Sequence, residues 1–144
     1  MSSTAGVQVQ AEINSASGRP PIKKGILVFI EQSGGAVERV SLEVLGKARE
    51  IADRQGVSVT AVLLGGDISD TALETADRGA DLVLVAESPL LNDFTVEAYL
   101  KVIHPLLVER DPGIILFGGT HNGTALAASL AVKMGAGPWL TSST

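Results

Sequence analysis

The 144-residue sequence contains no cysteine. Disulfide bonds, thiolate metal sites, iron–sulfur ligation and a cysteine nucleophile are therefore excluded. Histidine occurs only at His104 and His121, and His104 has no carboxylate or second histidine at a metal-ligand spacing. We therefore predict no metal site and no catalytic residue, and any redox role would need a borrowed cofactor.

Positive charge and long hydrophobic runs are also scarce. The net charge is -5, whereas nucleic-acid binding needs lysine and arginine concentrated on one surface. Apolar runs such as residues 25–30 and 80–86 are far shorter than the ~20 residues that span a bilayer. Residues 1–24 are rich in Ser, Gly, Gln and Pro and lack the apolar segment of a secretory signal. We expect no nucleic-acid partner, no transmembrane segment, a flexible tail over residues 1–24 and a cytoplasmic location in a bacterium or archaeon.

The sequence does contain alternating strand and helix patterns, with 45% hydrophobic residues overall. Strands separated by helices indicate βαβ units and a parallel sheet, and apolar strands without polar alternation indicate burial on both faces. We predict an α/β fold with an open three-layer parallel sheet and helices on both faces, over residues 25–138, followed by a linker or truncation point at 139–144. The candidate strands are residues 25–31, 57–64, 81–86 and 113–117, and the candidate helices are 41–54, 68–78, one starting near 95, and 122–134.

Several residues predict how these helices begin, end and pack. We expect Ser41 to cap the first helix and Gly56 to end it. Leu73 falls on the predicted core face of the second helix, and Gly79 is expected to end that helix in a left-handed cap. Pro105 should kink the third helix, because its ring removes one hydrogen-bond donor and clashes with the preceding turn.

Chemistry in such folds concentrates in the loops at the carboxyl ends of the strands, and three of these loops are rich in glycine. The loop after the fourth strand has the glycine spacing of a P-loop at Gly118 and Gly123, but Thr124 stands where the phosphate-binding lysine belongs. The dinucleotide pattern G-x-G-x-x-G is absent. The loop is therefore either a tight strand-to-helix turn or a contact for a ligand or flavin. The candidate cofactor-binding residues are Gly118, Gly119, Thr120, His121, Gly123, Thr124 and Glu31.

Three of the single residues can be interpreted in two ways. Glu31, at the end of the first strand, could anchor a nucleotide or partner, or could be a surface acceptor. His121 could contact a ligand, because its pKa allows a change of charge near neutrality. Trp139, the sole tryptophan, could fill the core or anchor an interface.

Several stretches together resemble the amino-terminal domain of electron-transfer flavoprotein alpha subunits. The resemblance covers about residues 24–137 and implies a Rossmann-like fold of the adenine-nucleotide-hydrolase type. The matching stretches are residues 24–31, 41–53, 62–65, 79–81, 89–91 and 95–99, together with Gly118, Gly119, Thr120, Gly123 and Leu126.

This resemblance implies a subunit of a heterodimer that carries electrons from flavin dehydrogenases, such as acyl-CoA dehydrogenases, to a quinone reductase or another acceptor. The domain would be a scaffold that pairs with a beta subunit, rather than an enzyme. In the family, a domain that binds FAD follows in the same chain, so we expect FAD in the complex, held by a separate or downstream domain. The beta partner could bind AMP or a second FAD.

The sequence departs from the family at two places. Thr124 and Ser129 occupy positions where the family commonly has arginine, and residues 139–142 stand where it often has a carboxylate and a cysteine. These departures put in doubt any flavin or interface contact made through those side chains. The alternative is a stand-alone module that binds adenine nucleotides, similar to the universal stress proteins. An independent enzyme is disfavoured, because no nucleophile, metal cluster or acid/base pair supports it.

Overall fold

Four apolar runs form the central parallel strands of a computed structural model, which describes residues 11–14, 24–135 and 141–142. They are β2 (Ile26–Ile30), β5 (Val59–Gly65), β6 (Leu82–Glu87) and β7 (Ile114–Gly118). Strand β2 pairs in parallel with both β5 and β7, and β5 pairs in parallel with β6. Most of their side chains are buried on both faces of the sheet, as parallel strands covered by helices require. The predicted parallel sheet is confirmed.

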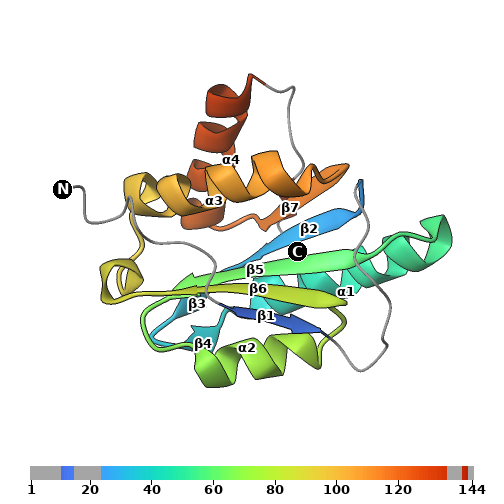
Figure 1. Cartoon of the computed structure of the whole chain (residues 1–144), viewed down its shortest axis with the longest axis horizontal. Helices are drawn as coiled ribbons and strands as arrows, with labels where there is room; N and C mark the ends of the chain where they lie inside the picture. The colour runs from blue at the N-terminus through green and yellow to red at the C-terminus, as the bar shows by residue number, and fades with distance from the viewer. Residues whose placement is uncertain (1–10, 15–23, 136–140, 143–144) are drawn as a thin grey trace.

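Helices cover both faces of this sheet, so the three-layer prediction is also confirmed. Helices α3 (Val96–Arg110) and α4 (His121–Met134) pack on one face, above the sheet in Figure 1. Helices α1 (Arg39–Gln55) and α2 (Ser69–Ala76) pack on the other. Each face has its own buried apolar cluster. No helix among the described residues is both long and apolar enough to cross a membrane.

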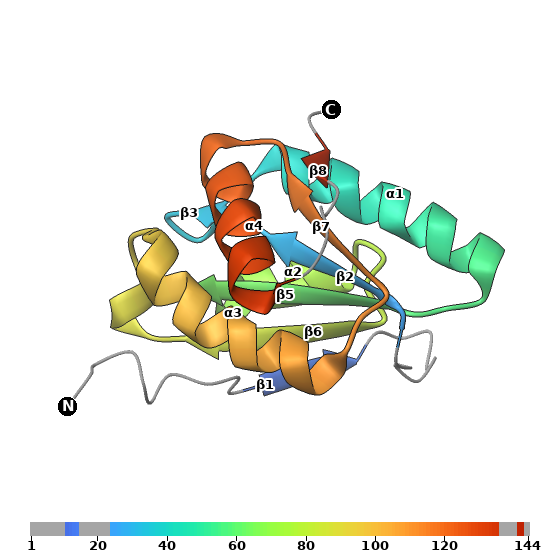
Figure 2. The same ribbon diagram turned by 90° about the horizontal axis from the view of Figure 1, so that it is seen from above.

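Two short strands complete the sheet at its edges, in the order β1-β6-β5-β2-β7-β8. Strand β1 (Ala11–Asn14) runs antiparallel along β6, at the lower side of the sheet in Figure 2, and β8 (Thr141–Ser142) runs parallel to the end of β7. The expected tail is therefore wrong for residues 11–14, which are ordered by pairing with β6. Residues 141–142 likewise form a strand within the expected linker. The remaining residues of both predictions, and Trp139, lie outside the described residues.

The helix ends confirm some local predictions and correct others. Gly56 ends α1 in the left-handed region, with φ of 68°. However, α1 begins at Arg39 with Glu38 as N-cap, and Ser41 does not cap it. Helix α2 ends at Ala76 with Asp77 as a right-handed C-cap, so Gly79 lies beyond the helix, and Leu73 is 58% exposed. The polar side chains of Thr71 and Thr75 are buried on α2 instead. Their burial is compensated by hydrogen bonds, because the Thr71 hydroxyl donates to the Gly35 carbonyl and the Thr75 hydroxyl donates to the Thr71 carbonyl one turn earlier in the helix.

Two further elements lie between the main ones, and one prediction about α3 remains open. A hairpin of β3 (Gln32–Ser33) and β4 (Ala36–Val37) follows β2, and a 3-10 turn, η1 (Pro89–Leu91), follows β6. Helix α3 continues through Pro105, and the kink there stays a prediction.

Candidate functional site

The carboxyl edge of the parallel strands gathers the loops in which ligands bind in folds of this type. Glu31 follows β2 directly, and the glycine-rich loop follows β7. Because β2 and β7 are neighbours in the sheet, the fold places these two loops side by side although they are far apart in sequence.

The carboxylate of Glu31 binds the beginning of α4. The hydroxyl of Thr120 donates a hydrogen bond to Glu31 Oε1 at 2.5 Å, and Asn122 Nδ2 donates to Glu31 Oε2 at 3.4 Å. Thr120 is the N-cap of α4, and its hydroxyl oxygen accepts a hydrogen bond from the Gly123 amide at 2.9 Å. The amino end of a helix favours negative charge. Glu31 supplies that charge from within the chain, near the position where a phosphate would bind.

The backbone of Glu31 is hydrogen-bonded as well as its side chain. Its amide donates to the hydroxyl oxygen of Ser41 at 2.8 Å, and its carbonyl accepts from the Glu38 amide at 2.8 Å. Ser41 is fully buried. Ser41 was predicted to cap α1, but its hydroxyl accepts from the Glu31 amide instead. This hydrogen bond fixes the carboxyl end of β2 to the first turn of α1.

Two glycines of the loop are explained by close packing. A methyl group at Gly123 would overlap the carbonyl oxygen of Gly118, and one at Gly118 would lie 2.9 Å from a methyl carbon of Val40. Both glycines are buried. Their main effect in this chain is to let β7, α4 and α1 approach each other.

The structure therefore divides the predicted site residues into two groups. Glu31, Thr120 and Gly123 come together in one hydrogen-bonded cluster, and Gly118 packs below it. The other three predicted residues, Gly119, His121 and Thr124, lie exposed on the surface of the same loop and the first turn of α4.

Gln32 forms a second polar cluster at this edge, which the sequence did not indicate. Its Nε2 donates to the Leu64 carbonyl at 3.1 Å, and its Oε1 accepts from the Gly35 amide at 2.8 Å. Nearby, the buried hydroxyl of Tyr99 donates to the Leu91 carbonyl at 2.8 Å. Burial raises the pKa of Tyr99, although a hydrogen bond with Gln32 acts in the opposite direction. These bonds join β3 to the end of β5, and α3 to η1.

Glu87 binds the beginning of α2, just as Glu31 binds the beginning of α4. It is the last residue of β6, and its Oε2 accepts hydrogen bonds from the Ile68 amide at 2.9 Å and the Ser69 hydroxyl at 3.4 Å. Ile68 is the N-cap of α2. The amino ends of two of the helices that begin at this edge are thus bound to carboxylates of the chain itself. In the sequence, the only signal of these contacts is a glutamate at the end of a strand.

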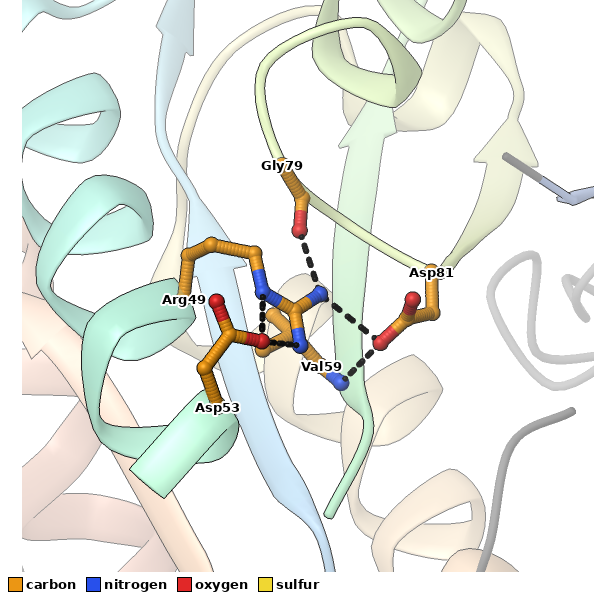
Figure 3. Close-up of polar contacts among 5 residues, drawn as sticks. All are labelled: Arg49, Asp53, Val59, Gly79 and Asp81. Carbon is orange, nitrogen blue, oxygen red and sulfur yellow. Dashed lines mark hydrogen bonds and ion pairs between the residues drawn. The ribbon is translucent and has the colours of Figure 1, made fainter. Parts of the chain in front are cut away.

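Among the ion pairs of the described residues, the most buried one lies at the opposite edge of the sheet, where β5 and β6 begin (Figure 3). Arg49 Nη1 on α1 lies 2.9 Å from Asp81 Oδ2 and donates to the Gly79 carbonyl at 3.0 Å. The same Asp81 oxygen accepts from the Val59 amide at 2.9 Å. Burial lowers the pKa of Arg49, but hydrogen bonds to Asp81 and Asp53 outweigh it and leave the pKa raised. This cluster fastens α1 to the sheet, far from the candidate site.

Metal binding has no support in residues 11–14, 24–135 and 141–142. No group of three histidine, aspartate or glutamate side chains there is arranged to hold a metal ion. The carboxylates of Glu31, Glu87 and Asp81 each bind donors of the protein itself.

Known proteins match most of the chain. A family model described as the electron transfer flavoprotein domain matches residues 26–140. The electron transfer flavoprotein subunit alpha of Thermoanaerobacterium thermosaccharolyticum is 40% identical over 111 residues, which are 77% of this chain and 34% of the relative. The protein FixB of Clostridium saccharobutylicum is 44% identical over 114 residues, 79% of this chain and 34% of the relative.

A third relative carries a different name. It is the lactate dehydrogenase (NAD(+),ferredoxin) subunit LctC of Acetobacterium woodii, 33% identical over 128 residues, which are 89% of this chain and 31% of the relative. The chain thus spans about a third of the length of the curated relatives it matches. With the family model matching most of its residues, the chain belongs to the electron transfer flavoprotein domain family, of the alpha-subunit and FixB type, with its Rossmann-like α/β fold.

Proposed function

We propose that the chain is the scaffold domain of an alpha-type electron transfer flavoprotein subunit. In this role it pairs with a beta subunit and supports flavin-mediated electron transfer from dehydrogenases such as acyl-CoA dehydrogenases. The family membership supports a role in electron transfer. The names of two relatives support dehydrogenase or reductase partners. One is the lactate dehydrogenase subunit LctC, and the other is the acryloyl-CoA reductase electron transfer subunit beta of Anaerotignum propionicum, 33% identical over 114 residues. The chain would act as part of a carrier rather than as a catalyst, in the cytoplasm.

The observation that carries this proposal is the position of Glu31. In a fold that binds nucleotides, the phosphates take the amino end of a helix after a strand. Here Glu31 occupies the amino end of α4 and hydrogen-bonds Thr120 at 2.5 Å. Its negative charge would repel a phosphate at that place. The described residues at this helix end therefore do not fit the pyrophosphate of FAD or the phosphates of ATP.

We accordingly assign FAD to a separate or downstream domain of the complex, with AMP or a second FAD in the beta partner. The exposed side of the loop, with Gly119, His121 and Thr124, would then face the partner chain or the flavin. In this arrangement Glu31 and Thr120 determine the position of the loop, and the exposed residues make the contact.

Calorimetric titration of the isolated chain with ATP, AMP and FAD tests the proposal against the stand-alone nucleotide module. We expect no tight binding of any of the three, and capture of the chain by an immobilised beta subunit of the same organism. Tight binding of ATP or AMP without a partner would favour the nucleotide module instead. Failure of the beta subunit to bind the chain would contradict the proposed pairing.

A further inference from the structure

Asn122 and Gly123 form the only Asn-Gly pair in the sequence. An asparagine side chain loses its amide nitrogen when the backbone nitrogen of the next residue attacks the side-chain amide carbon. Glycine in the next position hinders this attack least, because it has no Cβ. Asn122 lies half-buried in the first turn of α4. The pair therefore has the composition of a site that water can deamidate without an enzyme.

Hydrogen bonds occupy both of the groups that would react. The Gly123 amide, which would be the attacking nitrogen, donates to the Thr120 hydroxyl oxygen at 2.9 Å. The side-chain nitrogen of Asn122, which would leave, donates to Glu31 Oε2 at 3.4 Å. Both residues lie in α4, and helical backbone angles do not bring the attacking nitrogen onto the side-chain carbon. The reaction must therefore wait until the first turn of α4 opens.

We infer that Asn122 is a deamidation site, and that the N-cap hydroxyl of Thr120 controls the rate of the reaction. When the first turn opens, the Gly123 nitrogen attacks Asn122 Cγ, a carbon–nitrogen bond forms, and the nitrogen gives up its proton. The bond from Cγ to the side-chain nitrogen breaks, and ammonia leaves. Water then opens the cyclic imide at one of its two carbonyls, which gives aspartate or isoaspartate. Water is the only co-reactant, and nothing is oxidised or reduced.

The product of this reaction does not fit the cluster around Glu31. A carboxylate at position 122 has no hydrogen to donate, and it would repel the carboxylate of Glu31. Isoaspartate also adds one carbon to the backbone before Gly123, which moves the Gly123 amide out of register with the Thr120 hydroxyl. Deamidation would therefore loosen the joint between β2 and α4 irreversibly. The inference involves neither the flavin nor the beta subunit, so its test does not depend on the proposed function.

The test compares Thr120→Val with Thr120→Ser in the full 144-residue chain. Valine keeps the shape of the side chain but lacks the hydroxyl, whereas serine retains it. After incubation at neutral pH, mass spectrometry of a proteolytic digest gives the fraction of chains deamidated at position 122. We expect the rate in Thr120→Val to rise about fivefold or more, because the loss of the cap lets the first turn open more often. Thr120→Ser should react at the rate of the wild type.

Thr95→Val is the matched control at another helix. Thr95 is the N-cap of α3, and its hydroxyl oxygen accepts from the Ala98 amide at 3.2 Å. Its loss weakens the fold but leaves the Glu31 cluster in place, so Asn122 should react at the wild-type rate. Equal acceleration in Thr95→Val and Thr120→Val would show that global unfolding sets the rate. That result, an unchanged rate in Thr120→Val, or an equal rise in Thr120→Ser would overturn the inference.

The wild-type chain provides the test if Thr120→Val fails to fold. A synthetic peptide of residues 118–126 contains the same Asn-Gly pair without the contact to Glu31. We expect position 122 of the peptide to deamidate at least about tenfold faster than in the folded chain, because the peptide has no helix turn to open. Equal rates in the peptide and the folded chain would overturn the inference.

Discussion

The carboxylate of Glu31 accepts a hydrogen bond from the hydroxyl of Thr120 at 2.5 Å, although the two residues are 89 positions apart in the chain. This contact joins the end of β2 to the N-cap of α4 and places a negative charge at the amino end of that helix. It connects the fold to the proposed role, because the same charge that fixes the loop makes the helix end unfavourable for phosphate.

Replacing Glu31 should weaken this connection. We expect Glu31→Gln to lower the free energy of unfolding by about 1 kcal/mol, because glutamine can still accept a hydrogen bond but lacks the charge that strengthens it. Urea denaturation measures the change. The control is Glu38→Gln, since Glu38 is the N-cap of α1 but makes no side-chain cap bond. Equal losses in the two variants would show that the Thr120 contact is not the cause.

Two glycine-to-alanine substitutions should change stability in opposite directions. Gly46→Ala should raise the free energy of unfolding by about 0.5–1 kcal/mol, because alanine is the better helix former and nothing lies within 4 Å of its added methyl group. Gly123→Ala should lower it by about 1–3 kcal/mol through overpacking, because its methyl group would overlap the Gly118 carbonyl oxygen. Thermal denaturation of both variants checks the signs. A stabilised Gly123→Ala would refute the close-packing explanation for that glycine.

The two carboxylates that bind Arg49 should differ strongly in their effect on stability. The Asp81 side chain is 1% exposed and that of Asp53 is 54% exposed. Asp81→Ala should lower the free energy of unfolding by about 3–5 kcal/mol, because it leaves the partly buried Arg49 guanidinium without its main partner. Asp53→Ala should lower it by less than about 1 kcal/mol. Guanidinium denaturation of the two variants makes the comparison. Similar costs would mean that the buried pair does not fasten α1 to the sheet.

The raised pKa of Tyr99 predicts a loss of stability at alkaline pH. The folded state favours the neutral phenol, so this contribution is complete below the ordinary tyrosine pKa of about 10 and is lost as pH rises toward the folded pKa. Tyr99→Phe should cost about 1 kcal/mol near pH 7, because the bond to the Leu91 carbonyl is lost. The difference in the free energy of unfolding between this variant and the wild type should become smaller above pH 10, as measured by urea denaturation. A constant difference would show that the phenol does not titrate differently on unfolding.

The sequence alone indicated the four central strands and the four helices, because continuous apolar runs and three- and four-residue periodicity depend on local pattern. It did not indicate β1. Residues 7–14 do alternate apolar and polar side chains, which is a strand signal, but the surrounding polar composition suggested a tail. The pairing of β1 depends on the edge of β6, which no local pattern reveals.

The candidate site was only partly predictable for a related reason. Glycine spacing identified the loop after β7, and a strand-terminal carboxylate pointed to Glu31. Their contact depends on β2 and β7 being neighbours in the sheet, which the order of the strands in the sequence does not give. Ser41 shows the same limit, because a helix cap was the nearest local use for its hydroxyl, whereas the structure pairs it with the Glu31 amide ten residues away.

The amount of FAD bound by the purified chain on its own tests the scaffold account most directly. Flavin absorbance, measured after incubation with FAD and gel filtration, gives the ratio of FAD to chain. The account predicts essentially no retained flavin for the chain alone, and flavin in the complex formed with the beta subunit and the domain that binds FAD. A yellow, monomeric chain that retains one FAD per molecule would contradict it.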